Sequence, residues 1–395
     1  MQTPNNWFVA SASTHLVVCG LQGWKDLPHE LLHSILPLLS SLRDILAFAA
    51  TCPPWRAAFS SYPSKYTLCP PLLIQPNIRV PAPHIPSDNG HQKLRTCKVI
   101  DPAKPNTTMH CQIDEETLHE MYFAGSSYGQ LIFCSGQHCL VVDPFSGTKV
   151  SPPHFPLSIE CGELSVPEFS HPPGVSYSSS EQSSYIKHFC GFLTAPLASP
   201  NSHLLVNTRF SLLDWPVGSD SWYELQLSNK WLCQIVEFNG QFIAMDYGNR
   251  IYRLQLAPQL GLQEIAITKL PGFRFLCNQN YSWLVVCGDI LLRVTRFQID
   301  HLDMSTKPAK WVEMKNLDSW ALFLGGHVMS PPVSFMGPER WGGRSKCLYY
   351  ARYSPAWSVY SLGDDDNPSL RYMRAWCRRL QPLWLYPSML YRDGQ

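Results

Sequence analysis

Residues 233–256 contain Cys233-Gln-Ile-Val-Glu-Phe238, the pair Asn239-Gly240, Gln241-Phe-Ile-Ala-Met245, Tyr247-Gly-Asn249 and Arg250-Ile-Tyr-Arg-Leu-Gln-Leu256. An Asn-Gly pair between two apolar runs favours the tight two-residue turn that joins antiparallel strands. Gly and Asn in the second interruption favour another turn. The stretch therefore predicts a three-stranded antiparallel meander.

Similar paired runs occur at residues 130–142, 204–227, 283–299 and 347–362. Tight turns join them and no helical pattern separates them, which argues against a parallel βαβ sheet. A pattern of Trp, any residue, Glu and an apolar residue begins at Trp222 and again at Trp311, 89 residues later. This offset is close to two propeller blades of about 40–50 residues each.

The sequence accordingly predicts a mainly β protein with a β-propeller-like domain of about six or seven blades. A pair of β-sandwiches is the alternative architecture. We divide the chain into an N-terminal tail (1–23), a helical module (24–65), a proline-rich linker (66–93) and the β domain (94–390). Ser and Pro are frequent in residues 165–202, where we expect a long surface loop.

The helical module carries one apolar stripe at helical spacing, formed by Leu32, Ile35, Leu36 and Leu39. Pro37 should end or kink this first helix near Leu36. Ser41-Leu-Arg-Asp44 fits a capping box that opens a second helix, and a third short helix would carry Trp55. About 40 residues cannot bury enough surface to be stable alone. The module must therefore pack on another surface, either the β domain or a partner.

Composition and charge exclude several kinds of partner. The 395 residues include 31 Lys and Arg against 30 Asp and Glu, a net charge of +1 that provides no basic surface for nucleic acid or an anionic membrane. No apolar run approaches the roughly 20 residues of a membrane-spanning helix. The 14 cysteines form no C-x-x-C pair, which is typical of reduced thiols. We expect a cytoplasmic or nuclear location, or both.

One catalytic motif is present in outline. Gly125-Ser-Ser-Tyr-Gly129 matches the G-x-S-x-G pattern of serine hydrolases, with Ser127 as the nucleophile. That motif needs a helix after the serine, but Gln130-Leu-Ile-Phe-Cys134 reads as a strand, so a β-turn is the favoured interpretation. Neighbouring His and Cys residues lack the paired spacing of zinc sites. We therefore predict no catalytic residue, no metal site and no cofactor, and the substrate-binding residues stay unknown.

The helical module resembles the F-box motif. The matching residues are Leu27-Pro-His-Glu-Leu-Leu-His-Ser-Ile-Leu36, then Asp44-Ile-Leu46 and Cys52-Pro-Pro-Trp-Arg56, about a tenth of the chain. The resemblance implies docking on a Skp-type adaptor and, through it, on a cullin. It assigns the adaptor contact to Leu27, Pro28, Leu31, Ile35, Leu36, Ile45 and Leu46.

The β domain is similar to the propeller of plant F-box proteins of the kink-suppressed, brassinosteroid-signalling class. The matching landmarks include Gly125–Leu131, Val142–Gly147, Trp283–Leu292, Lys310–Met314, Trp320–Gly325, Lys346–Tyr350 and Trp384–Met389. This resemblance implies a non-catalytic substrate-recognition subunit of an SCF-type (Skp–cullin–F-box) E3 ubiquitin ligase, which brings a protein target for ubiquitination. The alternative is a propeller that binds a ligand, or a hydrolase, with the helices as a cap.

Overall fold

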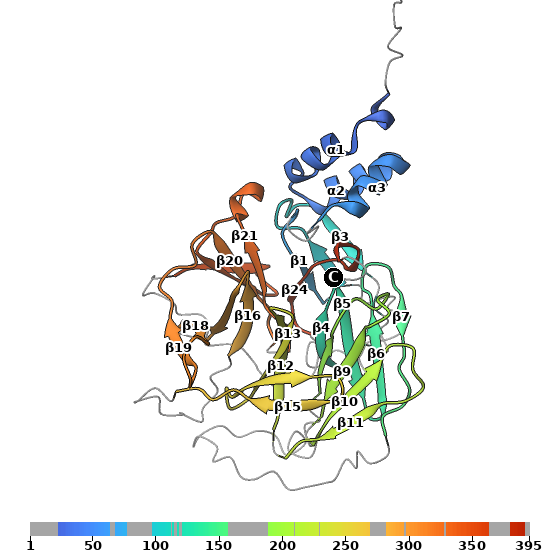
Figure 1. Ribbon diagram of the computed structural model, residues 1–395. Coiled ribbons are helices and arrows are strands. Elements are labelled where there is room, and N and C mark those ends of the chain that lie inside the picture. Colours follow the sequence, from blue (N-terminus) through green and yellow to red (C-terminus); the bar gives the residue numbers. More distant parts are fainter. Residues whose placement is uncertain are drawn as a thin grey trace, which may run out of the picture. The chain divides into compact units, whose positions relative to one another are not determined.

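The computed structural model describes residues 23–63, 68–76, 97–111, 113, 117, 121–156, 189–208, 210–228, 230–268, 282–295, 298–327, 329–362 and 380–391. The chain forms two compact units (Figure 1). One is the N-terminal helical module, which extends to Pro63 without residues 40–42, and the other is the β domain.

The helical module contains three α-helices, as predicted: α1 (His29–Ile35), α2 (Leu42–Thr51) and α3 (Pro53–Ser61). Pro37 ends α1 because a proline nitrogen carries no hydrogen to donate, and the chain continues as a single 3₁₀ turn over Leu36–Leu38. Pro53 opens α3 at a position where the missing N–H would have no partner. No described helix is long and apolar enough to cross a membrane.

The β domain contains six four-stranded sheets within the described residues. Blade 1 combines β24 (Leu383–Leu385), β1 (Leu72–Gln75), β2 (Cys97–Ile100) and β3 (Thr108–Cys111). Blade 2 contains β4 (Tyr122–Ser127), β5 (Gln130–Ser135), β6 (His138–Val142) and β7 (Lys149–Val150). Blade 3 contains β8 (Cys190–Leu193), β9 (His203–Asn207), β10 (Ser211–Pro216) and β11 (Tyr223–Gln226).

Blade 4 contains β12 (Leu232–Phe238), β13 (Gln241–Asp246), β14 (Ile251–Gln255) and β15 (Gly261–Glu264). Blade 5 contains β16 (Trp283–Cys287), β17 (Ile290–Val294), β18 (Ile299–Asp303) and β19 (Lys310–Glu313). Blade 6 contains β20 (Trp320–Leu324), β21 (Val333–Met336), β22 (Cys347–Ala351) and β23 (Trp357–Ser361). The domain is thus a six-bladed β-propeller, and the paired sandwiches are excluded.

Blade 6 departs from the simple meander of the other blades. Its strand order is β21-β20-β22-β23, and β20 runs parallel to β22, whereas every other pair among the described strands is antiparallel. The segment between β21 and β22 includes a 3₁₀ turn over Pro338–Trp341. The hairpin pattern of the sequence does not predict this parallel pair.

Two predicted boundaries need correction. Strand β1 lies inside the range 66–93 that we assigned to the linker, and β8 lies inside the range 165–202 that we assigned to a loop. Leu72, Leu73 and Ile74 are fully buried, because β1 lies between β2 and β24. A strand of four residues flanked by prolines has too short a pattern to stand out. Residues 66–67, 77–93 and 165–188 of these two ranges lie outside the described residues.

The apolar cores lie between neighbouring blades. Ala124 and Ile132 of blade 2 pack with Leu204 and Val206 of blade 3, and similar clusters join blades 3 and 4, 4 and 5, and 5 and 6. Between blades 6 and 1, the rings of Phe323 and Trp384 meet edge to face with centroids 5.0 Å apart. Blades 3, 4 and 5 therefore bury both faces against their neighbours, which explains why their strands read as continuous apolar runs.

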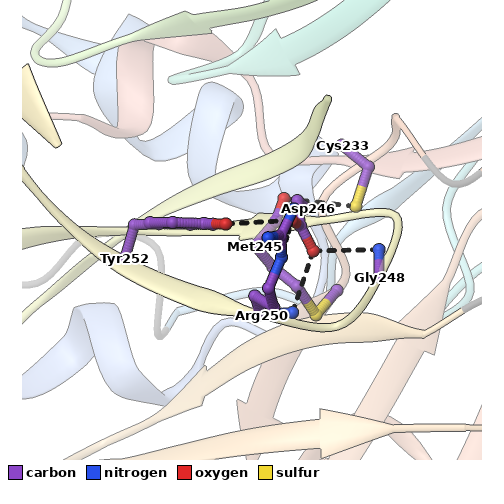
Figure 2. A network of polar contacts seen from close by, with 6 residues as sticks. All are labelled: Cys233, Met245, Asp246, Gly248, Arg250 and Tyr252. Carbon is purple, nitrogen blue, oxygen red and sulfur yellow. Dashed lines mark hydrogen bonds and ion pairs between the residues drawn. The ribbon is translucent and has the colours of Figure 1, made fainter. Parts of the chain in front are cut away.

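Buried acids hold the turns inside the blades, and the turn between β13 and β14 in blade 4 is the clearest case (Figure 2). The Oδ1 atom of Asp246 accepts hydrogen bonds from the backbone N–H groups of Gly248 and Arg250, each at 2.9 Å. Its Oδ2 atom accepts from Arg250 Nε at 2.7 Å and from the hydroxyl of Tyr252 at 3.0 Å. The carboxylate is thus fully bonded, as a buried charge requires.

Candidate adaptor-docking surface

Helices α1 and α3 of the module contact each other through polar side chains. His33 Nε2 lies 3.0 Å from the carbonyl oxygen of Ala58, to which it donates. The hydroxyl of Ser61 lies 2.8 Å from His29 Nε2 and 3.3 Å from His33 Nε2. The carbonyl oxygen of Ala58 also accepts from the hydroxyl of Ser61 at 3.2 Å, so these contacts tie α1 to the C-terminal end of α3.

The Trp and Arg of the third motif segment join α3 to α2 and to the 3₁₀ turn at Trp24–Asp26. Trp55 Nε1 donates to the carbonyl oxygen of Trp24 at 2.8 Å, and its ring packs on Phe48 of α2 with centroids 4.6 Å apart. Arg56 Nε donates to the carbonyl oxygen of Ala49 at 3.4 Å. Trp55 and Arg56, which carry part of the resemblance to the F-box, therefore position α3 against α2 and the start of the module.

The seven predicted adaptor-binding residues fall into three groups. Leu36 and Ile45 are fully buried. Half-buried positions are those of Leu27, Ile35 and Leu46, and the exposed ones are those of Pro28 and Leu31. Only exposed and half-buried side chains can touch a partner without rearrangement, so Leu36 and Ile45 would act by shaping the surface. Adaptor contact at these seven positions stays a prediction.

The sequence pattern did not identify two further exposed apolar residues. Leu38 is 79% exposed and Trp24 is 76% exposed, compared with 51% for Leu31. Large apolar side chains that stay in contact with water mark interaction surfaces when several occur in one small unit. The signal for Leu38 was present, since Pro37 interrupts the helix and shifts the next residue off the buried stripe. We name Trp24, Leu31 and Leu38 the exposed apolar set.

A histidine pattern was also missed. His29-Glu30-Leu31-Leu32-His33 matches H-E-x-x-H, the spacing that places two zinc ligands on one helical face in metalloproteases. Such enzymes need a third protein ligand. Among the described residues, no group of three or more His, Cys, Asp and Glu side chains is placed to hold a metal ion.

The serine of the G-x-S-x-G motif does not lie in a hydrolase elbow. Ser127 ends β4, and the left-handed residues Tyr128 (φ 48°) and Gly129 (φ 79°) form a two-residue turn into β5. The Ser127 side chain is buried, and its hydroxyl accepts a hydrogen bond of 3.1 Å from the backbone N–H of Leu193. The geometry is strand, turn and strand, which is the β-turn interpretation of the sequence.

The module and the propeller together define an F-box-like protein with a β-propeller. A family model described as F-box-like matches residues 24–63, and a model described as KIB1-4 beta-propeller matches residues 99–369. The chain therefore belongs to the KIB1-4 beta-propeller family, and the resemblance stated from the sequence is confirmed. Domains of both kinds are generally non-catalytic adaptors.

No curated protein matches the chain. Among solved structures, the Malassezia sympodialis allergen Mala s 1 is similar at 10% identity and a TM-score of 0.36, over 76% of this chain and 89% of that one. The WD40 domain of SCAP from fission yeast has 10% identity and a TM-score of 0.30, over 58% of this chain. The chain spans only about half, 54%, of the SCAP chain.

Proposed function

We propose that the protein is the substrate-recognition subunit of an SCF-type E3 ubiquitin ligase. In this proposal the helical module docks on a Skp-type adaptor, which connects it to a cullin, and the propeller binds a protein target. The observation that carries the proposal is the presence of an F-box-like module with an exposed apolar set in the same chain as a propeller. The exposed apolar set offers the adaptor an apolar contact, and the proposal assigns the protein target to the propeller.

The mechanism needs no chemistry from this chain. A receptor that holds a target near the charged conjugating enzyme raises the effective concentration of the target's lysines. The near-zero net charge supports a protein target over nucleic acid or an anionic membrane. We further propose a non-catalytic role and a location in the cytoplasm or nucleus. The plant resemblance permits a kinase of the glycogen-synthase type as the target.

Assembly of the complex tests this proposal. Purified full-length protein would be mixed with a cullin in the presence and absence of a Skp-type adaptor, and the cullin recovered with the protein would be measured. We expect recovery only when the adaptor is present. If an established F-box protein recovers the cullin under the same conditions and this protein does not, the proposed role is wrong.

A further inference from the structure

Two histidines of α1 point their Nε2 atoms at a common position. His29 and His33 are one helical turn apart, and their ring centroids lie 4.2 Å apart. Both Nε2 atoms approach the hydroxyl oxygen of Ser61, at 2.8 Å and 3.3 Å. His29 is exposed and His33 is half-buried, so solvent reaches the pair. The nitrogens are therefore already gathered around one point that an ion in solution can approach.

Imidazole nitrogens in this arrangement are ligands for borderline divalent metals. Residues four apart on a helix face the same side, and neutral imidazole binds Zn²⁺, Ni²⁺ and Cu²⁺ at about 2.0–2.1 Å through either ring nitrogen. Here the Nε2 atom of His33 carries a proton, because it donates to the carbonyl oxygen of Ala58. A change of tautomer moves that proton to Nδ1 and frees Nε2 for a metal.

We propose that His29 and His33 form a binding site for one divalent transition-metal ion. The ion lies near the present position of the Ser61 hydroxyl, with water molecules as the remaining ligands, since the described residues contain no third protein ligand placed for it. The open coordination distinguishes this site from a closed structural zinc site. Glu30, although it occupies the place of the metalloprotease base, has no assigned role here.

Metal binding at this site is coupled to the contact between α1 and α3. An ion on the two Nε2 atoms replaces the hydrogen bonds that His33 makes to Ala58 and His29 to Ser61. These bonds join α1, which carries Leu31, to the C-terminal end of α3. The ion therefore changes the contact between α1 and α3 in the module that the proposed function assigns to adaptor docking. The metal site itself does not depend on that function.

A second histidine pair provides a comparison. His138 and His154 of blade 2 also lie close, with ring centroids 4.4 Å apart. They come from a strand and a loop rather than from one helical face. No shared polar atom gathers the nitrogens of that pair in the described contacts. Proximity of two rings alone thus does not define the proposed site.

The test is a calorimetric titration of the full-length, reduced protein, with Ni²⁺ as the only added metal ion. We expect His29→Gln and His33→Gln each to weaken the strongest binding step at least tenfold, with no change in His110→Gln or in His138→Gln/His154→Gln. Ser61→Ala retains both imidazoles and removes the competing hydroxyl, so it should bind Ni²⁺ as tightly as the unchanged protein or more tightly. Its far-UV spectrum would show that the helices are intact.

Two results would overturn the proposal. One is unchanged Ni²⁺ binding in the His29→Gln/His33→Gln double variant, and the other is loss of binding in Ser61→Ala with native helices. Because no adaptor is present in the titration, a failure here is distinct from a failure of the proposed ubiquitin-ligase role.

Discussion

Ile74 pairs with Leu383 across the closing sheet of the propeller. These residues lie in β1 and β24, the first and last described strands of the β domain, and both are fully buried. Blade 1 thus takes three strands from the start of the domain and one from its end. In a ring of blades each sheet is packed on both faces. The pairing of β1 with β24 closes this ring, because it joins the two ends of the domain in one sheet.

Removal of β1 should open the propeller. A fragment of residues 64–395 retains β1, and we expect it to unfold cooperatively with a native β spectrum. A fragment of residues 91–395 lacks β1, so β24 and β2 lose their shared partner and buried apolar surface becomes exposed. We expect the shorter fragment to aggregate or to melt at a much lower temperature. Equal thermal stability of the two fragments would contradict this account of closure.

Two turn glycines form a matched pair for substitution by Ala. Gly129, in the turn between β4 and β5, and Gly240, in the turn between β12 and β13, both have left-handed backbones, with φ of 79° and 69°. A Cβ at Gly129 would lie 2.7 Å from the carbonyl oxygen of Tyr386, whereas a Cβ at Gly240 meets nothing within 4 Å.

Gly240→Ala should therefore cost about 1 kcal/mol of unfolding free energy, the penalty of the left-handed conformation alone. Gly129→Ala should cost at least about 2 kcal/mol more, because the backbone after β24 must move. Urea unfolding of both variants measures the difference. Similar losses would show that the turn does not pack closely on the C-terminal segment.

Buried thiols should make the fold less stable in alkali. Burial raises the pKa of Cys190 to about 12 and that of Cys287 to about 12. In the unfolded chain a thiol ionises at about pH 8.5. The unfolded state then loses protons that the folded state retains, so the unfolding free energy falls as the pH rises above about 8.5 and continues to fall until the folded thiols ionise.

Between pH 7.5 and 9.5, each such cysteine should lower the unfolding free energy by about 1 kcal/mol. Urea unfolding of the reduced protein at the two pH values measures this change. In Cys190→Ala the decrease should be smaller by that amount, whatever the absolute stability of the variant. A decrease equal to that of the unchanged protein would contradict the assignment.

The sequence predicted those elements whose local pattern agrees with their final environment. Asn239 and Gly240 both have left-handed backbones, at φ of 51° and 69°, as the hairpin pattern required. Trp222 directly precedes the outer strand of blade 3, and Trp311 lies in the outer strand of blade 5. One blade separates them, so the 89-residue offset does correspond to two blades.

The missed features depend on partners far along the chain. Strand β1 is recognisable only beside β24, which lies more than 300 residues later. The parallel pairing of β20 with β22 depends on β21 occupying the inner position of blade 6. In the module, the periodic stripe groups Leu36 with Ile35, yet Leu36 is fully buried and Ile35 is half-buried, because exposure depends on how three short helices pack.

Leu31 in α1 and Leu36 in the 3₁₀ turn that follows it differ in exposure, so substituting each one tests a different part of the docking account. Leu31 is 51% exposed and Leu36 is fully buried. Leu31→Asp should leave the helices intact but place a charge where an apolar contact is expected. A loss of about 3 kcal/mol of binding free energy would weaken adaptor binding roughly a hundredfold. Leu36→Asp buries an unpaired charge and should unfold the module instead. Far-UV spectra and thermal melting distinguish the two effects.

The affinity of the full-length protein for a purified Skp-type adaptor tests the central claim most directly. We predict measurable binding by the unchanged protein, a loss of roughly a hundredfold in Leu31→Asp with native helices, and no binding by the fragment of residues 64–395. An established F-box protein would serve as the positive control. If the control binds the adaptor and the unchanged protein does not, the account of this chain as an F-box receptor is contradicted.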